Sequence, residues 1–157
     1  MIRYGSLLAL CLLIFLIPAK AQKKKVKKAQ AIQKVVDAAY TYKGTPYKYG
    51  GTSKSGIDCS ALMQNSYAKA GIKIPRTAQA QSKYGKKVNW GNLKQGDIVF
   101  FKFKSKHEKW YHSGMITSVS PDGTYFIHAS TSKGVVVSNL ESDYYKKNVK
   151  TFRRVIN

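Results

Sequence analysis

The sequence predicts one α+β domain, in which N-terminal helices pack on a mostly antiparallel sheet. Apolar residues follow helical spacing in the first half of the chain, up to about residue 85. From residue 98 onward the pattern changes to short runs of β-branched and aromatic residues separated by turns, which is typical of strands. The 157 residues suit a single domain, and no internal repeat or second domain is visible.

The first 21 residues have the features of a secretory signal peptide. Arg3 supplies a positive charge, an apolar run extends from Leu7 to Ile17, and Ala19-Lys20-Ala21 fits a small-x-small cleavage site. We therefore expect cleavage near Ala21 and an exported protein, either periplasmic or associated with the cell envelope. The alternative is an uncleaved anchor, although the apolar run is short for a bilayer span.

A basic segment, QKKKVKK at residues 22–28, follows the cleavage site, and we expect a disordered or frayed lead-in there. The folded domain should then span residues 29–157. Its first element is an amphipathic helix over 29–42, which Gly44 and Pro46 end. The next stretch, GTPYKYGGTSKSGI, is rich in glycine, serine and threonine and favours a loop.

A second helix should begin at Cys59 with Asp58 as its N-cap, continue to about Ala70 and be closed by Gly71. Its inner face should consist of Leu62, Met63 and Tyr67. A third, short helix is expected over 77–84, with Thr77 as its cap. Strands are then expected over residues 98–103, 112–119, 124–129, 135–138 and 151–156, with a hairpin turn at 121–123.

The charge is strongly basic, with 28 lysines and arginines against 7 acidic residues and a net charge of +21. Such a surface favours polyanions. Nucleic acid would be the usual partner, but the signal peptide argues against it. Outside the cytoplasm the candidates are anionic envelope polymers and lipid headgroups, and the alternative is that the lysines only keep the protein soluble.

Cys59 would be the only cysteine left after cleavage near Ala21. A lone cysteine is a liability in an exported protein unless it is buried or used. Here it occupies the first turn of a predicted helix, where free N–H groups and the helix dipole favour a thiolate. The sequence therefore predicts a nucleophile with a lowered pKa, and the alternative is a buried structural thiol.

Three histidines could supply a base. His107 lies in the charged run KSKHEKW and should be a solvated loop residue, whereas His112 and His128 lie on adjacent strands of a hairpin. One of these two could hold the ring orientation of the other, as in a catalytic triad. A zinc site made of Cys59, His112 and His128 is the rival use, although the close ligand pairs of zinc motifs are absent.

Six segments in order, GTPYKYGG, GIDCSALM, IPRTAQAQ, LKQGDIVFF, HSGMI and FIHAS, resemble the NlpC family of papain-like cell-wall peptidases over roughly residues 30–155. The tail, FIHASTSKGVVVS with YYKK and FRRV, resembles the Spr-type murein endopeptidases. This resemblance implies a circularly permuted papain-like fold. It also implies Cys59 as nucleophile, His112 as general base and His128 as the polar third residue.

The resemblance further places Tyr47 near the oxyanion site and implies that Asp58 and Ser60 contact substrate. The family usually has glycine where this chain has Ala61, so a methyl group must fit there. The implied substrate is a peptidoglycan stem peptide, cleaved at the D-alanyl–diaminopimelate crosslink or at the γ-D-glutamyl–diaminopimelate bond. We expect a monomer without metal or organic cofactor, and the rival is a non-catalytic polyanion-binding protein on the same fold.

Overall fold

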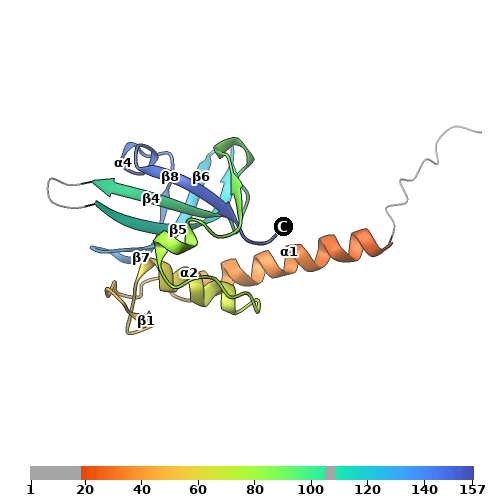
Figure 1. Ribbon diagram of the computed structural model, residues 1–157, viewed down its shortest axis with the longest axis horizontal. Helices are drawn as coiled ribbons and strands as arrows, with labels where there is room; N and C mark the ends of the chain where they lie inside the picture. The colour runs from red at the N-terminus through yellow and green to blue at the C-terminus, as the bar shows by residue number, and fades with distance from the viewer. Residues whose placement is uncertain (1–18, 105–108) are drawn as a thin grey trace, which may run out of the picture.

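The computed structural model describes residues 19–104 and 109–157, apart from the side chains at positions 19, 104, 109 and 110. Most of the predicted signal peptide and His107 therefore lie outside the described residues. Figure 1 shows a twisted sheet with helices against it and one long helix that extends beyond the rest of the domain.

The helices gather mainly in the first half of the chain, as predicted. They are α1 (Ala19–Tyr40), α2 (Cys59–Ala68), α3 (Ala78–Gln81), a 3-10 helix (Trp90–Asn92) and α4 (Asp143–Lys146). Two short strands, β1 (Thr52–Ser53) and β2 (Gly56–Ile57), form an antiparallel hairpin inside the predicted loop.

The main sheet has six strands in the order β3-β8-β4-β5-β6-β7, and all neighbours are antiparallel. These strands are β3 (Lys86–Val88), β4 (Ile98–Lys104), β5 (Lys109–Ser120), β6 (Gly123–Ser130), β7 (Gly134–Asn139) and β8 (Val149–Arg154). Strands were predicted at five of these six positions, within three residues at each end. β3 was missed because three residues with the sequence KKV carry no alternating pattern.

Both faces of the sheet are covered, and this explains the apolar run at the start of β4. One cluster joins α1 and α2 to Phe100 and Met115, while a second cluster on the opposite face contains Phe101 and Phe126. Consecutive residues point to opposite faces of a strand, so all four residues of Ile98–Phe101 are buried. The predicted inner face of α2 is confirmed, since Leu62, Met63 and Tyr67 are fully buried.

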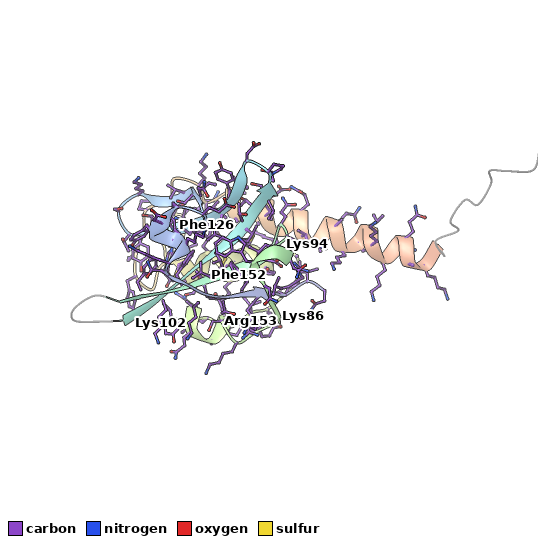
Figure 2. All side chains as sticks on the ribbon, turned by 90° about the horizontal axis from the view of Figure 1, so that it is seen from above. Lys86, Lys94, Lys102, Phe126, Phe152 and Arg153 are labelled. Carbon is purple, nitrogen blue, oxygen red and sulfur yellow. The ribbon has the colours of Figure 1, made fainter. Side chains whose placement is uncertain are left out.

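The basic lead-in is helical, which corrects the expectation of a frayed segment at residues 22–28. These residues continue α1 toward the N-terminus, because lysine, glutamine and alanine are all good helix formers. In Figure 2 the side chains of this half of α1 point into solvent, whereas Val35, Val36 and Ala39 of the other half are buried. Within the described residues, no helix is both long and apolar enough to cross a membrane.

The ends of two helices also differ from the prediction. α2 ends at Ala68, two residues early, and α3 ends at Gln81 rather than Tyr84. Gly71 still closes the turn after α2: its φ is +75°, and its N–H donates to the carbonyl of Ala68 at 2.9 Å. α4 was not predicted, because four residues make a single turn without periodicity.

A buried ion pair fastens the last strand to the start of β4. Arg154 donates from Nε and Nη2 to the two carboxylate oxygens of Asp97, each at 2.7 Å. The Lys94 N–H adds a bond of 2.8 Å to the same carboxylate, and Asp97 is only 1% exposed. Next to it, the Tyr67 hydroxyl donates to the carbonyl of Gly96, so the same corner also holds α2.

Replacing Arg154 with alanine should lower the free energy of unfolding by about 3 kcal/mol, because Asp97 would keep a buried charge without its partner. Lys150→Ala, an exposed change on the same strand, should cost less than about 0.5 kcal/mol. Urea unfolding at pH 7, followed by circular dichroism, measures both values. Equal small effects in the two variants would show that the ion pair does not stabilise the corner.

Candidate active site

Cys59 lies at the first position of α2, as predicted. Asp58 caps the helix, and its carboxylate accepts the Ala61 N–H at 2.7 Å. The segment 46–48 runs beside Ile57, whose N–H donates to the carbonyl of Pro46 at 3.0 Å. This pairing holds Tyr47 near Cys59, and the Ala61 methyl is accommodated in the core with no exposure.

The thiol meets β5 where that strand loses its partner β6. The ladder between β4 and β5 continues to Lys104 and Lys109, but the ladder between β5 and β6 stops at Gly114 and His128. Ser113 lies just beyond that end, close enough to Cys59 for its N–H to lower the pKa of the thiol. The Cys59 thiol thus lies beside Ser113, the residue that follows His112 on the strand.

The end of the same ladder brings the two histidines together. Gly114 lies directly opposite His128, so His112 is the diagonal neighbour of His128 on the same face. A Cβ at position 114 would lie 2.5 Å from Cδ2 of Phe126 and 3.1 Å from Cβ of His128. Glycine at position 114 thus makes room for Phe126 and His128, and Nε2 of His112 and Nδ1 of His128 lie 2.8 Å apart, a hydrogen-bond distance.

Aromatic rings enclose this histidine pair. Phe126 stacks on His128 at a centroid distance of 4.7 Å, and Phe101 lies 6.0 Å from His112. Burial lowers the pKa of His112 to about 4, although the residue keeps some contact with solvent. Burial and the neighbouring His112 lower the pKa of His128 to about 3. Both imidazoles are therefore neutral at pH 7.

The thiol is also neutral, which corrects the expectation of a lowered pKa. Cys59 is 8% exposed, and burial raises its pKa above the ordinary value, while hydrogen bonds from Ser113 and the Ser60 N–H act in the opposite direction. The position at the helix start was predicted correctly, but burial outweighs it. Among the described residues, no hydrogen bond joins Cys59 to His112, and such bonds often form only when substrate binds.

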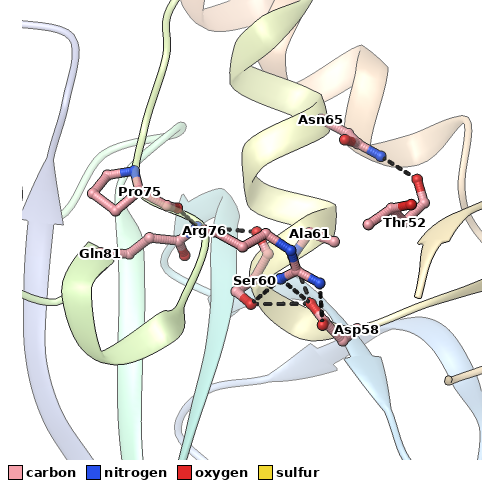
Figure 3. A network of polar contacts seen from close by, with 8 residues as sticks. All are labelled: Thr52, Asp58, Ser60, Ala61, Asn65, Pro75, Arg76 and Gln81. Carbon is pink, nitrogen blue, oxygen red and sulfur yellow. Dashed lines mark hydrogen bonds and ion pairs between the residues drawn. The ribbon is translucent and has the colours of Figure 1, made fainter. Parts of the chain in front are cut away.

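Asp58 and Ser60, the two expected substrate contacts, are bound to a residue that the prediction left without a role. Arg76 donates to both oxygens of Asp58, at 3.0 and 2.6 Å, and to Oγ of Ser60 at 2.8 Å (Figure 3). Burial alone would raise the pKa of Asp58, but hydrogen bonds from Arg76, Ala61 and Ser60 hold it below its usual value. The Arg76 side chain remains 37% exposed, so it can still reach a ligand.

A signal for Arg76 was available in the composition. The chain has only four arginines among 28 basic residues, and an arginine among lysines suggests a need for two-pronged hydrogen bonding. Gln81 supports the same loop by donating to the carbonyls of Ser60 and Pro75, at 3.0 and 2.7 Å (Figure 3).

Two further contacts involve residues that the sequence did not suggest. Nε2 of His128 lies 3.0 Å from Oγ of Ser138 and 3.1 Å from the hydroxyl of Tyr145. Both lie in the tail segments FIHASTSKGVVVS and YYKK, but only the strand register and the position of α4 show that they face His128. In the part of the chain that the structure describes, no three histidine, cysteine or acidic side chains are arranged to hold a metal ion.

The model of the NlpC/P60 family matches residues 44–154. A protein named murein DD-endopeptidase MepS/murein LD-carboxypeptidase, from Escherichia coli, is 33% identical over 83% of this chain and 66% of its own length. The bifunctional muramidase/DL-endopeptidase CwlT of Bacillus subtilis is 37% identical over 77% of this chain and 36% of its own length. This chain therefore spans less than two thirds of both relatives.

Among solved structures, an NlpC/P60 family protein from Bacillus cereus superposes with a TM-score of 0.71 at 28% identity. The match covers 80% of this chain and 40% of that protein. The predicted NlpC-type α+β fold is thereby confirmed.

The neutral state of the site predicts its response to pH. His112 should take up a proton only near pH 4, far below the usual value of about 6.5, and NMR titration of its ring nitrogens measures this. Iodoacetamide should alkylate Cys59, in a Cys11→Ser background, at a rate that keeps rising above the ordinary thiol pKa. A plateau of fast alkylation at pH 5–7 would instead indicate a thiolate–imidazolium pair.

The same pKa values also predict that the protein becomes less stable at low pH, so the titration needs a control for unfolding. The unfolded chain binds protons on both histidines near pH 6.5, whereas the folded protein does not. The free energy of unfolding should therefore fall as the pH drops from about 6.5 toward 4, and circular dichroism must show that the protein is still folded at each point.

Proposed function

This chain belongs to the NlpC/P60 family, and on that premise we propose that it is a cysteine peptidase that hydrolyses peptide bonds in peptidoglycan. One observation carries the proposal: the end of the β5–β6 ladder lies beside both the Cys59 thiol and a hydrogen-bonded pair of histidines. The names of the two relatives support the same class of substrate, because each name includes an endopeptidase activity together with a reference to murein or muramidase activity.

We assign the first step to Cys59 and His112. Nε2 of His112 is bonded to His128, so Nδ1 is the ring nitrogen that accepts the thiol proton. Because both groups are neutral at rest, the proton moves as the sulfur attacks the peptide carbonyl, and no stored thiolate is needed. His128 holds the His112 ring in place, and its neutral Nδ1 stabilises the positive charge that forms on His112 by accepting a hydrogen bond from it.

The later steps use the same groups. N–H groups in the first turn of α2 have no partner inside the helix, and we assign the backbone N–H of Cys59 to the developing oxyanion, with Tyr47 beside it. The tetrahedral intermediate breaks its C–N bond, and the leaving amine takes the proton from His112. Water then hydrolyses the thioester, with His112 again acting as base.

The substrate we propose is a stem peptide, with the D-alanyl–diaminopimelate crosslink as the favoured bond. The Spr-like tail and the name of the Escherichia coli relative support this choice, while the name of CwlT supports the γ-D-glutamyl–diaminopimelate bond as the alternative. Stem peptides carry free carboxylates, and the exposed guanidinium of Arg76, held by Asp58 and Ser60, is suited to bind one of them.

We further propose that the protein is exported and works in the periplasm or at the cell envelope as a monomer. The exposed half of α1 would contribute to binding there, because Lys23, Lys24, Lys25, Lys27 and Lys28 lie within two turns of one helix. Anionic envelope polymers or lipid headgroups are the partners that this charge fits.

The assigned roles predict the effects of three substitutions. Cys59→Ser should lower hydrolysis of purified sacculi by at least about 1,000-fold, since a serine hydroxyl remains protonated and is a weaker nucleophile. His112→Ala should lose about 100- to 10,000-fold, and His128→Ala a smaller share. Mass spectrometry of the released muropeptides measures the activity and identifies the bond.

Metal chelation separates this mechanism from a zinc site. Iodoacetamide should abolish activity and EDTA should have no effect. Loss of activity in EDTA, with recovery on adding zinc, would contradict the assignment. A protein that binds sacculi but releases no fragment at any pH would instead favour the non-catalytic alternative.

The charge predicts a difference between two assays. Binding to sacculi should weaken as salt rises, because exposed charges are screened beyond about 8 Å at physiological ionic strength. Turnover of a small soluble stem peptide should change much less, since the chemistry at Cys59 is local. Replacing the five lysines at 23, 24, 25, 27 and 28 with glutamine should reproduce the effect of high salt on sacculi alone.

Co-sedimentation measures binding to sacculi across a salt series, and a parallel assay measures turnover of the soluble stem peptide at the same salt concentrations. Glutamine keeps helix propensity close to that of lysine, so α1 itself is preserved. Equal salt sensitivity in both assays, or none in either, would show that the charge only maintains solubility.

A further inference from the structure

The far side of His128 carries a pair of hydroxyl groups that no step above uses. Oγ of Ser138 and the hydroxyl of Tyr145 lie 3.0 and 3.1 Å from Nε2 of His128, and they come from β7 and α4. A chain of polar atoms therefore runs from His112 through both nitrogens of His128 to these two oxygens.

The fold places each hydroxyl for a separate reason. His128 pairs with Val136, so Ser138 is its diagonal neighbour on β7, in the same relation that His112 has on β5. Tyr145 is held by its ring, which lies 5.5 Å from Phe101 and 4.9 Å from Phe126. Both residues are half-buried, and each hydroxyl oxygen has two lone pairs with which it can accept a hydrogen bond.

The positions of the protons on the two imidazoles determine whether these oxygens accept or donate a hydrogen bond. A neutral imidazole has one N–H and one bare nitrogen. If Nδ1 of His112 is bare and ready to accept the thiol proton, its Nε2 carries hydrogen and donates to Nδ1 of His128. Nδ1 of His128 must then be bare, so its Nε2 carries hydrogen and needs an acceptor.

In the opposite arrangement all the hydrogen bonds reverse. The hydroxyls would donate to a bare Nε2 of His128, Nδ1 of His128 would donate to His112, and Nδ1 of His112 would already hold a proton. His112 could not act as a base in that state. Once His112 is doubly protonated, only the first arrangement gives every N–H an acceptor.

We propose that Ser138 and Tyr145 are positioning residues, whose hydroxyl oxygens accept the Nε2–H of His128 and thereby keep His112 in its base form. The inference rests on the proposed peptidase function of the same site. It adds two residues to that site and determines that His112 donates, and His128 accepts, in the hydrogen bond between the two rings.

Two neutral hydroxyls, rather than a carboxylate, also suit the burial of the pair. The titratable groups that face His128 are His112 from β5 and Tyr145 from α4, and α2 adds Cys59 and Asp58 at the other end of the site. An anion beside Nε2 would favour a charged His128. Hydroxyls fix the tautomer without supplying charge, so His128 stays neutral.

The test uses the double variant Ser138→Ala/Tyr145→Phe in the full chain. Phenylalanine preserves the ring packing of Tyr145, and alanine fits a half-buried strand position, so the fold should be retained. We expect kcat to fall by about 10- to 100-fold with KM largely unchanged, and each single variant to lose about fivefold, since one acceptor remains. Threonine keeps the hydroxyl that alanine removes. The double variant Ser138→Thr/Tyr145→Phe should therefore have the same kcat as the single variant Tyr145→Phe.

The decisive readout is the tautomer, measured by long-range ¹H–¹⁵N NMR of the histidine rings at pH 7. Wild-type His128 should carry its proton on Nε2, and the double variant should show a mixture of both tautomers in His128 and His112. The control variant Tyr144→Phe/Ser118→Ala, which removes two exposed hydroxyls, should change neither tautomer nor kcat.

The NMR readout is independent of activity, so it separates two kinds of failure. If the wild type hydrolyses no stem peptide but shows the expected tautomers, the proposed function fails and the role of the hydroxyls stands. If the double variant keeps both the wild-type tautomers and the wild-type kcat, the inference is overturned.

Discussion

The end of the β5–β6 ladder is the constraint on which the rest of the site depends. Backbone pairing stops at Gly114 and His128, and the next residue along β5, Ser113, lies close enough to Cys59 to affect the pKa of its thiol. At the same point, the missing side chain of Gly114 makes room for Phe126 and His128, and His128 lies at hydrogen-bond distance from His112. The Cys59 thiol at the start of α2 and the histidine pair therefore lie at the same end of the sheet, because the β5–β6 strand pair separates there and its neighbour, β4–β5, does not.

Burial then decides the chemistry that this geometry supports. Helices cover one face of the sheet, and aromatic rings fill the other, so the thiol and both imidazoles are shielded from water. Burial disfavours the charged form of every one of these groups, which is why the resting site is neutral. In the proposed mechanism charge forms only during the reaction, and fixed hydrogen-bond donors and acceptors around it are then more effective than in water.

Much of this could be predicted from local sequence. Asp58 before an apolar helical pattern specifies where α2 begins, and the Pro121-Asp122-Gly123 turn specifies that the strands carrying His112 and His128 are adjacent. Local patterns failed where the outcome depends on distant residues. The lowered pKa expected for Cys59 was wrong because strands far along the chain bury it, and Arg76 was passed over because its partner Asp58 lies 18 residues away.

The sequence by itself determined the fold class, the order of its elements and the identity of the lone thiol and its two candidate histidines, because these depend on periodicity, capping and turn chemistry between near neighbours. Only the tertiary structure decided which ring nitrogens face each other, that Ser138 and Tyr145 share one nitrogen of His128, and that the thiol and imidazoles are neutral. Those outcomes depend on strand register and on how much water the packed faces exclude, and both are set by residues far apart in the chain.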